Sequence, residues 1–482
     1  MAQQTIQIKN QVLGGISDSK YLGIADSVSK MVGFSLHNEP GVILVNPALK
    51  KISASLIDGL IKKSIVASNG ETYLFSADSG KVWRIKSDKI TMELCYTTSA
   101  SVGESKCLGG EEYNGYIVWF TQNKVHRISL TNALVTTWAT LDLNWKDFLV
   151  GDLLYHPSSI QTGVLYVGDN SVIAQLDGET WSQKAFEARL GEQKHRVSIL
   201  INYLTSIIIG TFISSNVVNS MVALWNTWST AISFKDELPE VGVNSVLKTD
   251  NLVIANIGKK GNFYVFNGSQ MEQYKKIPGN WGGPFGPDTA IVHPDANVNA
   301  NGMPMFALSN VSGNPADQGV YSLGSYSREY NKILNLEYVI STGHMANVEI
   351  GSIFMMGTDF FVCWKDNTVP ATPIYGVDKV DLDNKFNGAF FETRLIQINR
   401  KETKDVFVDV FYRTLPANTD IKIQTRVNHG NWSSPISLVN DTVHKRKYKK
   451  IAIKAACIEI RVVTSSYGNT APEIDLTEIS FN

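Results

Sequence analysis

The sequence has few charged residues and almost no net charge. Charged residues make up 18% of its 482 residues, and the formal net charge is −1. A soluble domain usually has about a quarter of its residues charged. A chain this close to neutrality has no overall field that would attract nucleic acid or an anionic membrane. We therefore do not expect a free DNA-binding protein.

Two further absences narrow the class of protein. The most apolar stretch, Val197–Phe212, is interrupted by Asn202, Thr205 and Ser206 and is too short to span a bilayer, so we expect no membrane insertion. The first ten residues have neither a basic segment nor an apolar core, so we expect no secretory leader. The few cysteines lack the spacing of metal ligands, and we expect buried, reduced thiols in a protein made in a reducing cytoplasm. They are Cys95, Cys107, Cys363 and Cys457.

Residues that favour strands and tight turns are abundant. The chain contains 37 glycines, and hydrophobic residues make up 43% of it, which is ample for a buried core. Segments with the 3.6-residue spacing of a helix are nearly absent. This excludes a helical solenoid and predicts an all-β fold.

Seven short apolar runs recur along the chain. The starts of successive runs lie 44, 48, 42, 46, 52 and 56 residues apart. Such a recurrence is typical of a repeat protein in which each repeat is one small structural unit. The runs are Thr72–Phe75, Tyr116–Phe120, Val164–Val167, Ser206–Ile209, Leu252–Ala255, Pro304–Ala307 and Phe360–Cys363.

The residues around these runs repeat as well. Most runs follow a turn-forming pair such as Asn69-Gly70, and Asn-Gly is a strong hairpin signal because both residues accept a positive φ. A further strand with two bulky apolar residues three positions apart follows, as with Val82 and Ile85, and then a more polar strand. Four short strands per unit match one blade of a β-propeller. We predict a seven-bladed β-propeller of four-stranded antiparallel blades over residues 46–395; six or eight blades would require one unit to be misread.

The pattern changes after Leu395 to longer strands of alternating polar and apolar residues. About six antiparallel strands of this kind predict a compact C-terminal β-sandwich over residues 396–482. The expected strands are Val406–Arg413, Asp420–Val427, Trp432–Leu438, Tyr448–Lys454, Cys457–Thr464 and Ile474–Phe481.

Residues 1–45 precede the first unit and show no strong alternation. This segment is either an arm that reaches a neighbouring subunit or a strand that helps to close the ring. The sequence leaves both interpretations open.

Part of this N-terminal segment resembles a known family. Lys9-Asn10 followed by Gly14–Ser17, with Asn38–Val42 and Pro47 after them, resembles the start of the short-tailed phage nozzle family, also called tail tubular protein B. Near the C-terminus, Tyr412–Pro416 before a strand is similar to sandwich modules of phage virion proteins. The resemblance covers only these stretches, and the chain is shorter than typical nozzles, which carry extra platform domains. It therefore resembles either a minimal nozzle or a related β-propeller protein of the tail or neck.

The resemblance implies a place in a virus particle. In that family a propeller forms the body of a hexameric tube below the head-to-tail adaptor. We therefore expect a virion structural protein of the tail or neck that is synthesised in the host cytoplasm. Its partners would be copies of itself in a ring, the adaptor and other tail components, with genome DNA passing through the lumen without sequence-specific binding. The alternatives are an adhesion propeller that binds a host-surface glycan or receptor, and a propeller glycosidase.

The motifs that carry chemistry in other propellers are weak here. Residues Ser76–Trp83 match an Asp-box, in which Asp78 would cap a tight turn through backbone N–H groups. His156 and His293 each precede a proline near the start of an inner strand, and they form either a pair of axial ligands or, as we prefer, a repeated structural turn. We expect no enzyme, no catalytic or cofactor-binding residues, no cofactor and no metal ligands.

The one dense basic run is His444–Lys450, in the C-terminal module. It could bind an acidic partner, a membrane surface or DNA phosphates. The simpler interpretation is a hairpin whose lysines face solvent and discourage edge-to-edge strand pairing. The candidate partner-binding residues are Lys445, Arg446, Lys447, Lys449 and Lys450.

Overall fold

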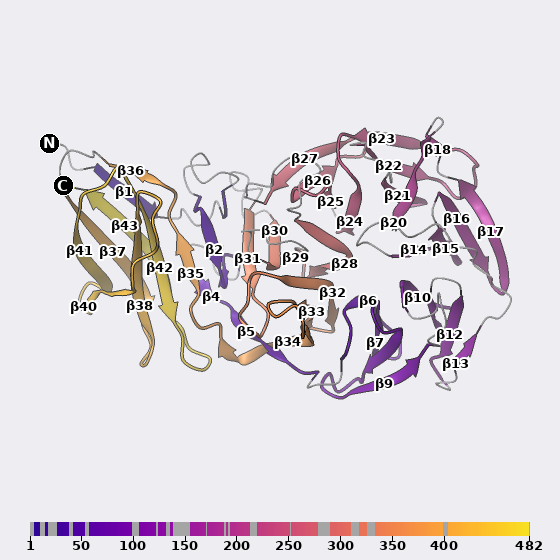
Figure 1. The fold of residues 1–482 in the computed structure, drawn as a ribbon, viewed down its shortest axis with the longest axis horizontal. Coiled ribbons are helices and arrows are strands. Elements are labelled where there is room, and N and C mark those ends of the chain that lie inside the picture. The colour runs from indigo at the N-terminus through magenta and orange to yellow at the C-terminus, as the bar shows by residue number, and fades with distance from the viewer. Residues whose placement is uncertain are drawn as a thin grey trace.

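The computed structural model of this chain is all-β (Figure 1), and the residues that it describes contain no helix. The described residues are 4–9, 15–17, 27–37, 42–53, 57–98, 106–121, 124–131, 135–137, 155–169, 171–187, 189–190, 193–212, 219–250, 252–277, 290–309, 318–324, 333–398 and 403–481.

Most of the described strands lie in four-stranded antiparallel units, numbered here from 1 to 7 along the chain. Units 1 to 5 are separate sheets, whereas units 6 and 7 are parts of one 14-stranded sheet that also includes C-terminal strands. In Figure 1 these units surround a common centre, which the first strand of each unit faces. Units 1 to 3 are β6 (Ile61–Val66), β7 (Thr72–Ser76), β8 (Lys81–Ile85) and β9 (Met92–Thr97); β10 (Gly109–Tyr113), β11 (Tyr116–Phe120), β12 (Val125–Ser129) and β13 (Val135–Thr137); and β14 (Ser158–Gln161), β15 (Val164–Asp169), β16 (Val172–Asp177) and β17 (Thr180–Glu187). Units 4 and 5 are β20 (Arg196–Tyr203), β21 (Ser206–Phe212), β22 (Ser220–Trp225) and β23 (Phe234–Leu238); and β24 (Val243–Lys248), β25 (Val253–Ile257), β26 (Asn262–Phe266) and β27 (Met271–Lys276). Units 6 and 7 are β28 (Ile291–Ala300), β29 (Met303–Ser309), β30 (Gly319–Gly324) and β31 (Ile333–Tyr338); and β32 (Val348–Met356), β33 (Asp359–Asp366) and β34 (Ile374–Lys385) with β5 (Pro47–Lys51).

The second strand of each unit contains one of the seven apolar runs. In β7 and β25 every residue is buried, because both faces of these strands pack against neighbouring sheets. The turn residues before these strands adopt the positive φ angles that hairpin turns need. Asn301 and Gly302, for example, have φ values of 52° and 88°. A small antiparallel pair, β18 (Arg189–Leu190) and β19 (Gln193–Lys194), lies between units 3 and 4 in the sequence.

Unit 7 takes its fourth strand from the other end of the repeat. Strand β5 lies before unit 1 in sequence and pairs antiparallel with β34, with Lys51 opposite Asp378 and Ala48 opposite Asp381. The side chain of Lys51 also donates to the carbonyl of Tyr375 at 2.7 Å. Residues at the two ends of the repeat are therefore held in one sheet.

The N-terminal segment pairs with both parts of the molecule. Strand β1 (Gln4–Lys9) pairs with β43 (Glu473–Phe481), and β2 (Lys30–Val32) lies between β31 of unit 6 and β35 (Phe390–Glu392). A short hairpin, β3 (Phe34–Ser35) and β4 (Leu44–Val45), follows β2. In the described residues, this segment forms strands with its own chain.

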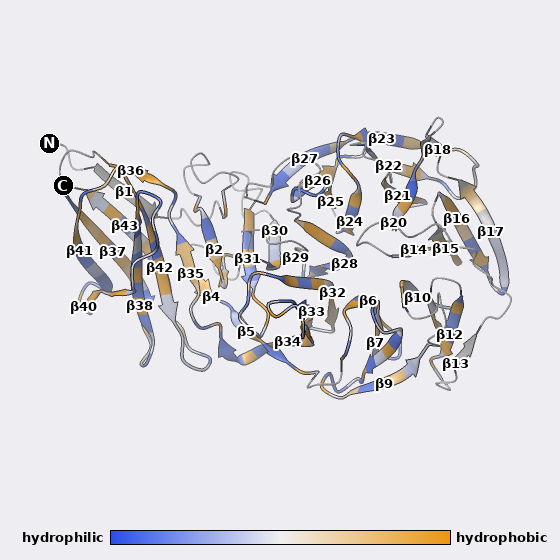
Figure 2. Ribbon diagram, viewed as in Figure 1, coloured by the Kyte–Doolittle hydropathy of each residue, from blue (hydrophilic) through white to orange (hydrophobic). Residues whose placement is uncertain are grey.

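The C-terminal strands form two sheets whose apolar faces contribute to one buried cluster. Figure 2 shows apolar and polar residues alternating along these strands. In β37, Val406, Val408 and Val410 are fully buried, whereas the intervening residues are partly exposed. One sheet has the order β1, β43, β37 (Lys404–Thr414), β41 (Arg446–Ile453) and β40 (Val439–Asp441). The other contains β39 (Ile436–Ser437), β38 (Asp420–Val427) and β42 (Cys457–Ser465), which pairs with β35 and β36 (Ile396–Gln397).

Two expectations differ from this arrangement. The segment Trp432–Leu438 contains only the two-residue strand β39, and Pro435 precedes it, a residue that lacks the N–H a strand ladder needs. Strand β35, which precedes residue 396, pairs with β42 of the C-terminal sheet. The C-terminal sheet therefore includes residues that precede the change in the sequence pattern.

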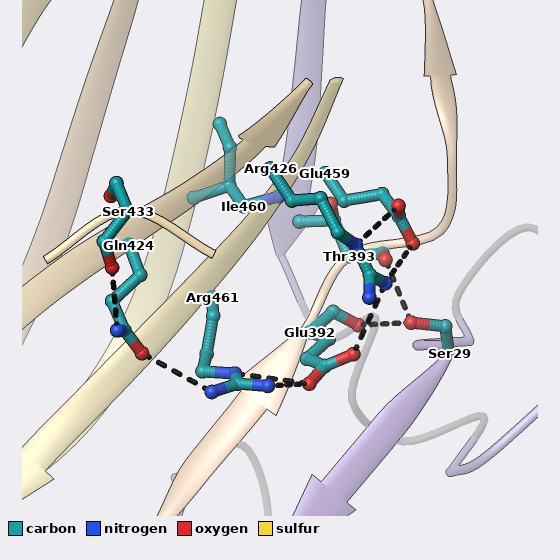
Figure 3. Close-up of polar contacts among 9 residues, drawn as sticks. All are labelled: Ser29, Glu392, Thr393, Gln424, Arg426, Ser433, Glu459, Ile460 and Arg461. Carbon is teal, nitrogen blue, oxygen red and sulfur yellow. Dashed lines mark hydrogen bonds and ion pairs between the residues drawn. The ribbon is translucent and has the colours of Figure 1, made fainter. Parts of the chain in front are cut away.

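Figure 3 shows the polar network that joins these segments. Arg426 donates to both carboxylate oxygens of Glu459 at 2.8 and 2.7 Å, and Arg461 donates to Glu392 at 3.0 and 2.5 Å. Both guanidinium groups also stack on Trp432, at 4.4 and 4.3 Å from the ring centroid. The Arg426–Glu459 pair is bidentate, and such pairs fix orientation as well as contributing energy. The network therefore holds β35, β38 and β42 in one arrangement.

Candidate functional site: the axial ion network

The first strands of the units bring charged side chains together at the centre of the ring. We call this cluster the axial ion network. It consists of Lys63 and Ser64 of β6, Glu111 of β10, Tyr155 before β14, Asp295 of β28 and Ser352 of β32. The side chains of Lys63, Glu111 and Asp295 are 12%, 27% and 16% exposed.

Lys63 is the cation of this network. Its Nζ lies 3.1 Å from Asp295 Oδ1 and 3.8 Å from Glu111 Oε1. Tyr155 interacts with it electrostatically. Lys63 therefore links the first strands of units 1, 2 and 6.

Asp295 accepts hydrogen bonds from two other first strands. Its Oδ2 accepts from the backbone N–H of Ser64 at 2.7 Å and from Ser352 Oγ at 2.6 Å. Asp295 also lies opposite Ser352 in a parallel bridge between β28 and β32. This carboxylate consequently connects unit 6 to units 7 and 1, the last and first units of the repeat.

A second ion pair lies on the same strands. Glu349 of β32 contacts His293 Nε2 at 3.0 Å and Lys62 Nζ at 3.5 Å. Burial raises the pKa of Glu349, but the hydrogen bond from His293 and the charges of His293 and Lys62 outweigh it and hold that pKa at about 2. Glu349 is therefore ionised at physiological pH.

The electrostatics restrict what the axial network can do chemically. Burial lowers the pKa of Lys63, but Asp295, Tyr155 and Glu111 outweigh burial and hold that pKa well above its ordinary value. Lys63 thus stays protonated and cannot serve as a base or nucleophile. Burial raises the pKa of Glu111, an effect that Lys63 only partly offsets.

The two carboxylates of this network lie against the same ammonium group. Paired carboxylates hydrolyse glycosidic bonds when a sugar lies between them. Here the space between Glu111 and Asp295 holds the Nζ of Lys63. The arrangement is an ion-paired crosslink between strands.

The candidate partner-binding residues lie on the hairpin of β40 and β41. Arg446 contacts Asp409 at 3.1 Å and Asp441 at 3.3 Å, and Lys450 contacts Asp405 at 2.7 Å. Lys447 is buried and pairs with Asp420, and Lys445 donates to the carbonyl of Arg413 at 3.4 Å. Lys449 lies between them on β41 and is partly exposed. The structure thus brings these five residues together, with carboxylates beside three of them.

The two His-Pro histidines are buried at the start of inner strands, as the sequence places them. The Nδ1 of His156 lies 3.3 Å from the carbonyl oxygen of Gly168, and His293 contacts Glu349. In the Asp-box, Asp78 accepts from the backbone N–H of Leu60 at 3.0 Å. Asp78 therefore caps the start of β6, whereas in the Asp-box turn the backbone N–H of Ser79 donates to Ser76 Oγ at 3.2 Å.

Acidification should destabilise the protein through His156. Burial holds the pKa of His156 well below its ordinary value of 6.5. The unfolded chain therefore binds a proton below pH 6.5 that the folded chain does not, and stability falls as the pH decreases from there. Relative to a His156→Asn variant, the wild type should lose about 2 kcal/mol of unfolding free energy between pH 7.5 and 5. Urea denaturation across this range measures the difference, and parallel pH profiles would contradict the prediction.

No group of histidine, cysteine, aspartate or glutamate residues suited to a metal ion occurs in the described part of the chain. None of the described segments contains a helix with the length and apolar character needed to cross a bilayer. Of the cysteines, Cys107, Cys363 and Cys457 are buried and Cys95 is partly exposed, and none forms a disulfide.

Sequence reasoning missed the axial network. Lys63, Glu111 and Asp295 each lie on the strand that precedes an apolar run, which the repeat pattern leaves unassigned. The sequence did contain a signal for this network. Each of the three residues is a charged residue on the strand that directly precedes one of the apolar runs. Their partners could not be read from the repeat, because Lys63 and Asp295 are 232 residues apart.

Comparisons with known proteins leave the family open. The sequence matches no protein-family model and no curated protein. Among solved structures, the extracellular domain of a hybrid two component system from B. thetaiotaomicron is 13% identical with a TM-score of 0.49, over 75% of this chain and 43% of that chain. A streptogramin B lyase is 10% identical with a TM-score of 0.45, over 70% of this chain and 98% of that chain. The chain spans less than half the length of the first of these, and at such TM-scores neither likeness carries an argument about function.

Proposed function

We propose that this protein is a structural component of a virus particle, of the tail nozzle or neck type found in short-tailed phages. Its body would be a closed seven-bladed β-propeller followed by a C-terminal β-sandwich. The family resemblance of Lys9–Ser17 and Asn38–Val42 supports the viral assignment. The pairing of β5 with β34 supports the closed ring, because it leaves unit 7 with four strands like the others.

The observation that carries the structural role is the ion-paired centre of the ring. A binding site presents polar groups that are available to a ligand, but here Asp295 and Glu111 both contact Lys63. Such a centre suits a rigid building block. The proposal therefore gives these carboxylates no catalytic role.

The route of DNA follows from the same contacts. Lys63 of unit 1 lies 3.8 Å from Glu111 of unit 2 and 3.1 Å from Asp295 of unit 6, so one side chain reaches non-adjacent units at the centre. A DNA duplex cannot pass through a centre so narrow. In our proposal the lumen lies between protomers that stand side by side in a ring, with the C-terminal sandwich contacting the adaptor or another tail component.

Rings of the full-length protein are the expected result. Analytical ultracentrifugation and negative-stain microscopy should show closed homo-oligomers, and mass spectrometry should detect the chain in purified phage particles. Its absence from particles would contradict the virion assignment. Release of reducing sugar from a host polysaccharide that Glu111→Gln abolishes would contradict the non-catalytic role.

A further inference from the structure

An unusual hydrophobic surface lies at one edge of unit 4. Trp228 is 82% exposed, in the turn between β22 and β23, and Leu204 is 74% exposed, in the turn between β20 and β21. Ile207 of β21 pairs with Trp225 of β22, so the two turns lie side by side at the same end of the sheet. We call residues 202–206 and 226–233 the unit-4 tip.

Hydrogen bonds hold the backbone of the turn that carries Trp228. The backbone N–H of Trp228 donates to Asn226 Oδ1 at 3.2 Å, and the buried Trp225 donates its indole N–H to the carbonyl of Ser229 at 2.6 Å. Ser229 in turn donates its backbone N–H to the carbonyl of Asn226 at 3.0 Å. A rigid turn loses little conformational entropy when its side chains bind a partner.

The neighbouring turn contains strained backbone. Leu204 has a φ of 53°, in a region that a bulky residue rarely adopts and that costs about 1 kcal/mol or more. Asn114, Thr162 and Asn301 stand at the corresponding turns of other units, each followed by glycine. Two side-chain amides tie this turn to unit 3: Gln161 of unit 3 donates to the carbonyl of Leu204 at 3.1 Å, and Asn202 of unit 4 donates to the carbonyl of Ile160 at 2.9 Å. Leu204 is both exposed and strained, so the energy gained from burial does not offset the cost of its backbone conformation. A strained residue of this kind indicates a functional role.

The chemistry of the tip is neutral. Residues 202–206 and 226–233 contain no charged side chain, and apart from the apolar residues they are asparagine, serine, threonine and a tyrosine. The cation recorded beside the tip is Lys248, 6.0 Å from the ring of Tyr203. An indole surrounded by hydroxyl and amide groups matches a sugar ring, which has C–H groups on its faces and hydroxyl groups at its edge.

We infer that the unit-4 tip binds an uncharged polysaccharide, with Trp228 stacking on a sugar ring and Leu204 contacting its neighbour. Anionic lipids or nucleic acids would be matched by clustered cations, which the tip lacks. A stable protein interface would need about 800 Å² on each partner with enclosed hydrophobic anchors, whereas the tip offers two isolated ones. This inference is independent of the proposed place in the virion.

Binding can be measured on the full-length protein with neutral hexasaccharides of glucose, mannose, galactose and N-acetylglucosamine as probes. Heparin serves as the anionic comparison, and tryptophan fluorescence and calorimetry as readouts. At least one neutral probe should bind, and Trp228→Ala should weaken that binding about tenfold or more, whereas Trp228→Phe should retain most of it. Tyr467→Ala, which removes an aromatic ring that is 64% exposed on the C-terminal module, should leave binding unchanged.

Leu204→Asn gives a second, independent variant. Asparagine tolerates the positive φ, so this variant should fold and raise the midpoint of thermal unfolding by about 1–2 °C. It should also weaken sugar binding about threefold, because the apolar contact is lost. A stabilised variant with unchanged binding would show that Leu204 does not contact the sugar and would overturn that part of the inference.

Three outcomes would overturn the inference as a whole. The wild type could bind none of the neutral probes, or Trp228→Ala could bind them as well as the wild type. Alternatively, Trp228→Ala could abolish self-association of the protein in ultracentrifugation, which would make the tip a contact between copies. Binding of heparin alone, lost in Trp228→Ala, would contradict the neutral chemistry of the site.

Discussion

Replacing Lys63 by methionine should lower the free energy of unfolding by about 3 to 5 kcal/mol. Methionine has a similar length but no charge, so Glu111 and Asp295 would remain close together without the cation that now separates them. Removing one partner of a buried ion pair costs this much because the remaining charge stays desolvated. Urea denaturation followed by tryptophan fluorescence would measure the change.

Two control variants test whether charge explains this loss. Lys86→Met removes a lysine that is 42% exposed and lies 2.9 Å from Glu93, and it should cost no more than about 0.5 kcal/mol. A triple variant that combines Lys63→Met with Glu111→Gln and Asp295→Asn should recover much of the stability, because no unpaired charge remains. If Lys63→Met is no worse than Lys86→Met, the axial network does not hold the ring together.

Deleting residues 1–52 should abolish the folded state. The deletion removes β5 and thereby leaves β34 as an exposed strand edge next to unit 1. It also removes β2, which pairs with both β31 and β35, and β1, which pairs with β43. Exposed edges of this length favour aggregation. We expect insoluble protein, or soluble protein without a cooperative thermal transition by circular dichroism.

A shorter deletion is the matched control. Removing residues 1–9 deletes only β1 and leaves β2 and β5 in place. This variant should stay folded, and the midpoint of thermal unfolding of its C-terminal module should be lower than in the wild type, because β43 loses its partner β1. If the longer deletion instead gives a folded monomer with the midpoint of the shorter one, β5 is not needed to close the ring.

Much of the repeat could be predicted from local sequence. The apolar runs, the Asn-Gly turns and apolar pairs such as Val82 and Ile85 all depend on residues that are close together in the chain. The runs lie in the second strand of each unit, the pairs lie in the third strand, and the turns connect strands. The C-terminal strands were found for the same reason, because their alternation reports which face is buried. The exception is Trp432–Leu438, where the indole of Trp432 packs on Arg426 and Arg461 and little of the segment joins the sheet.

The candidate site could not be predicted in this way. The basic run Lys445–Lys450 was visible as a cluster of like charges, but the acidic residues beside it come from other strands, such as Asp405 and Asp409 of β37. A run of cations in a sequence therefore says little about the charge that a partner would meet. The tip of unit 4 was equally hidden, because exposed and buried tryptophans such as Trp228 and Trp225 look alike in a sequence.

The amino-acid sequence by itself determined the strands, the turns and their recurrence, because these depend on alternation and on backbone preferences within a few residues. Only the tertiary structure decided that β5 completes unit 7, that β2 joins unit 6 to the C-terminal sheet, and that Lys63 meets Asp295. These contacts join residues tens to hundreds of positions apart, and one edge strand or one charge has many chemically equivalent partners along the chain. The tertiary arrangement of the units selects among them, because it brings particular strand edges and first-strand side chains within bonding distance.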